Sequence, residues 1–143
     1  MAYLVNKDGY FKIALNEIQK NDLNFNSTAV THTISDADFN QIRKNKSYVT
    51  IVDGVVEVNV FETTEFFREN EEELKHDHQN LKKILKDFLD NNPSSKELYS
   101  QAQTYYDTLN NLDYSTITFP LNKTWEDYCE ENSIQYLHYL QIP

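Results

Sequence analysis

The stretch Val-Thr-Ile-Val-Asp-Gly-Val-Val-Glu-Val-Asn-Val, residues 49–60, decides the fold of the first half of this chain. Asp53-Gly54 separates two valine-rich runs and favours a type I′ turn, in which both central residues take a positive φ. The alternation of apolar and polar residues on either side predicts two antiparallel strands with one buried and one more polar face. Pairing about the turn builds the apolar face from Val49 with Val58 and Ile51 with Val56.

A second hairpin is predicted at the N-terminus, where Asp8-Gly9 provides the same turn. The turn and the alternation agree on the register, in which Leu4 lies opposite Ile13 and Asn6 opposite Phe11. The apolar face of this hairpin is expected to comprise Ala2, Leu4, Phe11, Ile13 and Leu15.

The sequence between the hairpins predicts one strand and one short helix. Residues 28–34 are rich in Thr and Val and favour a strand. Ser35 is a suitable N-cap, and Asp38 places a negative charge in the first turn of the helix that follows. Phe39 and Ile42 are expected to face the sheet.

The middle of the chain predicts a helical hairpin. Residues 64–91 contain no Gly or Pro, and residues 91–93 (Asn-Asn-Pro) interrupt the pattern. Ser94 and Glu97 are spaced as a capping box for the second helix, with a hydrophobic staple between Pro93 and Leu98. Because a two-helix hairpin of this length is marginal alone, we expect the sheet or a second copy of the chain to complete its core. The two helices carry heptad-like seams: Phe67, Glu71, Leu74, His78, Leu81, Leu85 and Phe88 in the first, and Leu98, Ala102, Tyr105, Leu109 and Leu112 in the second.

The C-terminal segment reads as an arm. Residues 115–120 favour an extended conformation, and Thr124 can cap a short helix over 125–132. Residues 134–143 are rich in aromatic and aliphatic side chains, which the domain itself or a partner must cover.

These patterns together predict an α+β protein. Its parts are a small antiparallel β domain with one short helix at 1–61, a long antiparallel helical hairpin at 62–113, and an extended or short-helical aromatic arm at 114–143.

Composition excludes several classes of function. The chain has 143 residues and a net charge of −10, and nine of these ten charge units lie after residue 61. An acidic surface of this kind is unsuited to the phosphate backbone of nucleic acids. Cys129 is the only cysteine, so neither an intramolecular disulfide nor a thiolate metal cluster is available. No apolar run is long enough for a membrane span, and charges within the first ten residues argue against a signal peptide, so we expect synthesis in a reducing cytoplasm.

The candidate catalytic and metal-binding groups have simpler explanations. His76 and His78 point to different sides of a helix, so they cannot share one ion. Glu72 and His76 could supply two ligands, but no third is local. Cys129 lies among acids, which raise the pKa of a thiol and weaken it as a nucleophile. We therefore expect no enzymatic activity, no catalytic residue, no metal and no cofactor.

Aromatic residues are the strongest indication of function. Tyr and Trp are favoured at protein interfaces because their rings are apolar and their tips polar. The same residues could instead line the margin of a small core, and both interpretations stay open. His78 interrupts the first helical seam and could make it sensitive to pH. The candidate interface residues are Tyr99, Tyr106, Trp125, Tyr128, Tyr136 and Tyr139.

Three stretches resemble tail-fibre assembly and tail accessory proteins of tailed bacteriophages. They are residues 3–11 around Gly9-Tyr10-Phe11, residues 34–39 (Ile-Ser-Asp-Ala-Asp-Phe), and residues 52–55 (Val-Asp-Gly-Val). Residues 119–128 and 140–143 look like the ends of small proteins encoded among phage structural genes. The resemblance transfers no functional residue.

The resemblance implies a non-enzymatic protein of the tail, as a fibre, adaptor or baseplate accessory that is either a virion component or an assembly chaperone. It would be made in the host cytoplasm, form a homo-oligomer or part of a larger assembly with other phage structural proteins, and bind neither nucleic acid nor membrane. The alternative is an acidic inhibitor that mimics the charge of nucleic acid, although Lys82, Lys83 and Lys86 interrupt its acidic helix.

Overall fold

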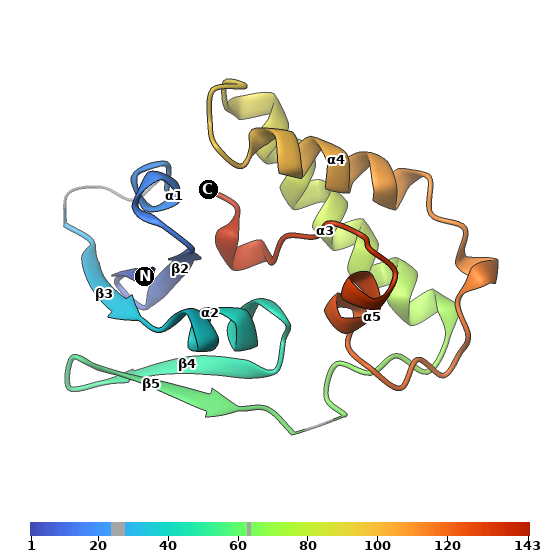
Figure 1. Cartoon of the computed structure of the whole chain (residues 1–143), viewed down its shortest axis with the longest axis horizontal. Coiled ribbons are helices and arrows are strands. Elements are labelled where there is room, and N and C mark those ends of the chain that lie inside the picture. The colour runs from blue at the N-terminus through green and yellow to red at the C-terminus, as the bar shows by residue number, and fades with distance from the viewer. Residues whose placement is uncertain (24–27, 63) are drawn as a thin grey trace.

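The protein has an α+β fold in a computed structural model that describes residues 1–23, 28–62 and 64–143 (Figure 1). Strands occupy the N-terminal half, the long helices follow, and the C-terminal segment returns between them. The described residues form a three-stranded sheet of order β2-β1-β3 and a two-stranded sheet, β4-β5.

The first sheet contains the predicted N-terminal hairpin. β1 (Ala2–Lys7) pairs with β2 (Tyr10–Ala14), and β3 (Val30–Ile34) pairs antiparallel with the other edge of β1. The predicted register is confirmed, with Leu4 opposite Ile13 and Asn6 opposite Phe11. Leu15 is exposed and does not join the apolar face, because β2 ends at Ala14.

The second hairpin also has the predicted register. β4 (Ser47–Val52) and β5 (Val55–Val60) pair so that Val49 lies opposite Val58 and Ile51 opposite Val56. Asp53 and Gly54 have φ values of 52° and 76°, as a type I′ turn requires.

Two short helices accompany the sheets. α2 (Asp36–Arg43) begins after Ser35, whose hydroxyl accepts a hydrogen bond from the Asp38 N–H, and it buries Phe39 and Ile42 as predicted. α1 (Glu17–Asn21) was not anticipated; the Asn16 side chain caps it. α1 lies against β1 and β2, where Leu23 forms a small cluster with Val5 and Ala14.

The two long helices bury most of the predicted seams. α3 (Glu71–Asn91) begins after its N-cap Asn70, so Phe67 lies before the helix rather than in its first turn. α4 (Tyr99–Asn110) packs against α3 and runs broadly back along it (Figure 1). The buried seam residues of α3 are Leu74, His78, Leu85 and Phe88. Those of the second seam are Leu98, which precedes α4, and Ala102, Tyr105 and Leu109 within it.

The predicted capping box at the start of α4 is wrong. The helix starts after Leu98, and no side chain caps it. The Glu97 N–H donates instead to the Asp22 carboxylate at 2.8 Å, and the Lys96 ammonium donates to the Asp22 carbonyl oxygen at 2.9 Å. A contact with the end of α1, 74 residues away in sequence, therefore replaces the local cap.

The C-terminal segment contains the predicted short helix and two 3₁₀ turns that were not predicted. α5 (Trp125–Glu131) is capped by Thr124, as expected. Residues Tyr114–Thr116 form a 3₁₀ turn, η1, rather than extended chain, because the Asp113 side chain accepts the Ser115 N–H. A second 3₁₀ turn, η2 (Tyr139–Gln141), lies beside β2.

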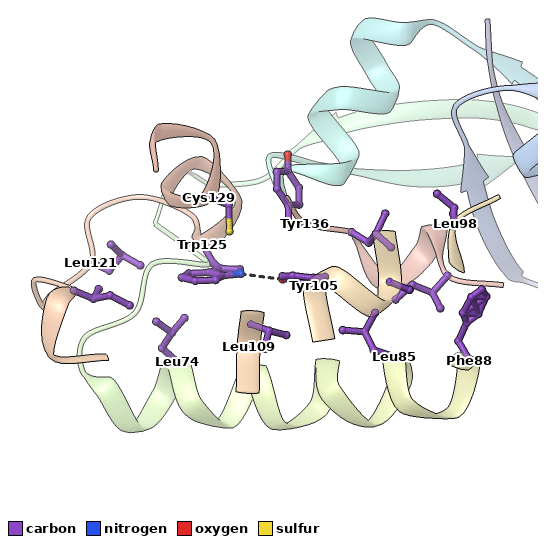
Figure 2. Packing of buried hydrophobic residues seen from close by; sticks show 14 residues of the cluster. Leu74, Leu85, Phe88, Leu98, Tyr105, Leu109, Leu121, Trp125, Cys129 and Tyr136 are labelled. Carbon is purple, nitrogen blue, oxygen red and sulfur yellow. Dashed lines mark hydrogen bonds between the residues drawn. The ribbon is translucent and has the colours of Figure 1, made fainter. Parts of the chain in front are cut away.

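The described residues form two main apolar cores. One is built from the first hairpin, α2 and the inner face of the second hairpin. The other joins α3 and α4 to α5 and the C-terminal residues, so the chain's own last segment contributes to the helical core (Figure 2). Coverage by a second copy stays a prediction. Leu140 packs on the first core while Leu137 and Ile142 are buried in the second, so the C-terminal segment connects them. The three-part division of the chain stays a prediction.

We expect Gly54→Ala to lower the free energy of unfolding by about 1 kcal/mol, because a Cβ is unfavourable in the left-handed region. A Cβ at residue 54 would have no heavy atom within 4 Å, so the effect should be conformational and not a steric clash with neighbours. Denaturant titration of the full chain measures it. Asp53→Asn is the matched control and should be nearly neutral, since asparagine tolerates a positive φ; equal losses in both variants would contradict the explanation.

Candidate functional site

The six aromatic residues predicted for an interface lie in different environments. Trp125 and Tyr136 are buried in the helical core and are not available on the surface. The Trp125 Nε1–H donates to the Tyr105 hydroxyl at 2.9 Å (Figure 2). The Tyr136 hydroxyl donates to Glu130 Oε1 at 3.0 Å, and the Arg43 guanidinium lies 4.2 Å from the centre of its ring.

The other four candidates lie at the margin of the core or outside it. Tyr99, Tyr106 and Tyr128 are half-buried and pack against the helical core, and the Tyr128 ring stacks on Trp125 at 5.4 Å. Tyr139 is 53% exposed. The structure therefore does not bring the six residues together into one surface, and contact with a partner through the outer four stays a prediction.

A different apolar surface lies on the second hairpin. Val52 and Val55, which pair beside the turn, are 55% and 60% exposed on the outer face, and Tyr48 is exposed on the same face. Val60 pairs with Ser47 at the far end of β5, on the face of Val49 and Val58, and is 79% exposed. Among the described residues β5 is hydrogen-bonded to β4 alone, so its other edge carries unpaired N–H and C=O groups. The excess of valine in residues 49–60 was a usable indication of this surface, since a hairpin with one buried face needs few apolar residues on the other.

A cavity of about 380 Å³ lies between the two cores. The end of α2, β4, α3, α5 and the C-terminal segment contribute its walls. Its aromatic lining includes Tyr48, Phe61, Phe66 and Trp125, and its polar lining includes Asn45, Arg68, Asp77, His78, Glu126 and His138.

A chain of hydrogen bonds connects Glu126, Asn45 and His138 in the wall of this cavity. The Asn45 side-chain amide donates to Glu126 Oε1 at 2.8 Å, and its Oδ1 lies 2.7 Å from His138 Nε2. His138 Nδ1 accepts the Leu140 N–H at 3.1 Å. Since Oδ1 can only accept, the His138 proton must be on Nε2, and the ring is neutral. Asn45 follows α2 with a φ of 57°, a conformation that asparagine tolerates.

Burial sets the protonation of these groups. It raises the pKa of Glu126 to about 7; a backbone hydrogen bond opposes the rise, Asp77 and Asp127 add to it, and Arg68 opposes it slightly. Burial also lowers the pKa of His138 to about 4, with a smaller effect from Arg43. Near neutral pH the site thus has a carboxyl that gains or loses its proton readily beside an uncharged histidine.

His78 is the second buried histidine of the cavity lining and is only 1% exposed. Its Nδ1 lies 2.7 Å from the Tyr114 hydroxyl, and its ring meets the Trp125 ring edge-on at 4.3 Å. Nε2 has no hydrogen-bond partner among the described residues. Burial, helped by Lys82, lowers the pKa of His78 to about 4.

Sequence reasoning did not identify this site. Asn45, Glu126 and His138 come from segments far apart in the sequence, and no local spacing predicts that they meet. Asn45 lies in the cationic run 43–46 at the end of α2, and Glu126 lies in the first turn of α5, so neither stands out in the sequence.

Catalysis by Cys129 is not favoured. The thiol is buried, and burial together with Glu126 and Glu130 raises its pKa, so it stays protonated near neutral pH. Over the described ranges, no three His, Cys, Asp or Glu side chains are placed to hold a metal ion.

No helix in the described part of the chain has the length and apolar character that a membrane crossing requires. Comparisons with models of protein families, with curated proteins and with solved structures find no match.

Proposed function

We propose that this protein is a non-enzymatic structural or assembly protein that acts through protein–protein contacts, in the tail of a bacteriophage. The observation that supports contact with another protein is on the second hairpin. There β5 has an unpaired edge among the described residues, and Val52, Val55 and Val60 are exposed. The phage context rests on the sequence resemblance alone.

An unpaired strand edge is a template for another strand, because its backbone groups pair with any extended segment laid beside it. Soluble proteins usually protect such edges with charge or proline. β5 reads Val-Val-Glu-Val-Asn-Val and has Glu57 as its single charged residue. This composition favours an edge that another chain covers, either a second copy or another tail protein.

Mimicry of nucleic-acid charge is the second candidate, and ion pairs along α3 weaken it. Lys75 lies 2.8 Å from Glu71, and Lys86 lies 2.9 Å from Asp90. These lysines break the row of carboxylates that a mimic of the phosphate backbone would need.

Two measurements test the proposal. Size-exclusion chromatography with light scattering on the full chain should show self-association, or co-elution with tail proteins, that Val55→Lys abolishes by placing a charge on the hairpin. Ile18→Lys is the matched control, because Ile18 is 63% exposed on α1, away from β5. Mass spectrometry of purified particles then distinguishes a virion component, which is present stoichiometrically, from a chaperone, whose deletion removes fibres.

A monomer at high concentration that neither occurs in particles nor affects fibres when deleted would contradict the proposal. Tight binding to a nuclease or polymerase would support the charge mimic instead.

A further inference from the structure

Glu126 is a buried carboxyl that no cation neutralises. It is 8% exposed, and the described residues place no Lys, Arg or His in an ion pair with it. Its side chain accepts a hydrogen bond from the neutral Asn45 amide. An ionised carboxylate in this position is costly to bury without a counter-charge.

The charged groups around Glu126 do not supply that counter-charge. Arg68, before α3, is engaged by Asp77 of α3 at 2.5 Å. Asp127 of α5 is paired with Lys46 at 2.9 Å. His138 of the C-terminal segment and His78 of α3 are held neutral near pH 7 by burial, which lowers the pKa of each to about 4. Arg43 of α2 lies over the Tyr136 ring and is not part of the cavity lining. Among the side chains that line the cavity, an ionised Glu126 therefore has no counter-charge.

Aromatic rings line the same cavity. Tyr48 and Phe61 lie 4.8 Å apart, and Phe61 meets Phe66 edge-on at 4.8 Å. The faces of such rings attract cations, and the Arg68 guanidinium already lies 5.8 Å from the centre of the Phe66 ring. The net charge of −10 also draws cations toward the protein at long range.

We propose that this cavity binds an organic ammonium ion, with its charge paired to the Glu126 carboxylate and its apolar body against the aromatic wall. The ammonium belongs either to a free amine or to a lysine side chain of a partner protein, since both present the same group. The volume of about 380 Å³ is at the lower end of the range of small-molecule sites. This ligand site goes beyond the proposed structural function and does not depend on it.

Binding of the ammonium is coupled to release of a proton. Burial raises the pKa of Glu126 to about 7, so below this pH the carboxyl is mainly protonated and must ionise to pair with the ligand. The affinity should rise about tenfold per pH unit well below pH 7 and level off above it. An aliphatic amine stays protonated throughout this range, like the lysine side chain.

Isothermal titration of the full chain with phenethylammonium tests the site. We expect the affinity to rise about 30-fold between pH 5.5 and pH 8, with release of close to one proton at the lower pH. Glu126→Gln should abolish both the binding and its pH dependence while keeping an oxygen for Asn45. Tyr48→Leu should weaken binding about fivefold through loss of one ring. Glu57→Gln on the exposed β5 is the matched control and should bind like the wild type.

Further ligands test whether the positive charge is required and whether the ammonium comes from a free amine or from a partner's lysine. The uncharged analogue 2-phenylethanol should bind at least tenfold more weakly than phenethylammonium at pH 8. Binding of N-acetyl-lysine methylamide but not of phenethylammonium, with the same loss in Glu126→Gln, would assign the site to a partner's lysine. Equal binding of the alcohol and the ammonium, binding independent of Glu126, or no binding of either ammonium compound would overturn the proposal.

Discussion

Trp125→Ala is expected to lower the free energy of unfolding by about 4 kcal/mol, the range of buried aromatic-to-alanine changes. Trp125 is buried where α5 meets the two long helices (Figure 2). His78 and Tyr128 pack on its ring at 4.3 Å and 5.4 Å. The change also removes the donor to the buried Tyr105 hydroxyl, which adds the cost of an unsatisfied polar group. Denaturant titration monitored by far-ultraviolet circular dichroism measures the loss.

Two further variants separate the contributions. Trp125→Phe keeps much of the ring contact and loses the donor, so about half of the effect should remain. Tyr10→Ala removes an aromatic ring that is 78% exposed and should cost less than about 1 kcal/mol. If Trp125→Ala cost no more than Tyr10→Ala, the C-terminal segment would not contribute to the helical core as described.

The second large effect is a dependence of stability on pH with opposing contributions. His78 and His138 have pKa values lowered from 6.5 to about 4 in the folded protein, so the unfolded chain binds more protons there and stability falls as the pH drops below 6.5. Glu126 acts in the other direction, because its pKa is raised from 4.5 to about 7 and the folded state holds the extra proton. From pH 6 to pH 5 the two histidines therefore outweigh the single carboxyl.

Between pH 5 and pH 6 we expect the stability of the wild type to increase by about 1 kcal/mol per pH unit, the effect of close to one net proton. His78→Leu removes one histidine and should make the slope nearly flat. Glu126→Gln removes the opposing carboxyl, so its slope should be about twice that of the wild type, and the variant should exceed the wild type by up to about 3 kcal/mol at pH 8.

Denaturant titrations at closely spaced pH values measure these slopes, and comparison between variants cancels the contribution of other carboxyls. Equal slopes in all three proteins would show that these groups are not buried as described. The predicted pH sensitivity of His78 thus acquires a direction, with acid destabilising the helical seam.

Local chemistry was sufficient to predict both hairpins. In each, an Asp-Gly turn and the alternation of side chains require the same register, so a slip by one residue would move every apolar side chain to the wrong face. The caps at Ser35 and Thr124 were equally predictable, because each contact spans only three residues. The same holds for the seams of α3 and α4, which follow from periodicity.

The errors occurred where a distant contact replaced a local one. Ser94 and Glu97 have the spacing of a capping box, yet Asp22 takes the Glu97 N–H. The aromatic candidates were also judged by residue type, and type does not distinguish a buried Trp125 or Tyr136 from an exposed Tyr139. Whether an aromatic ring is buried depends on the side chains that pack against it, and these come from residues distant in the sequence.

The sequence by itself determined the α+β class, the two hairpin registers, the helical seams and the excess of acid in the second half, because each depends on interactions between residues close along the chain. Only the tertiary structure decided that the C-terminal segment contributes to the helical core and that Asn45 joins Glu126 to His138 beside an aromatic cavity. These features combine segments 81 and 93 residues apart. Their pKa values and the proposed ligand site depend on burial and on hydrogen-bond partners, which exist only once the two cores have packed together.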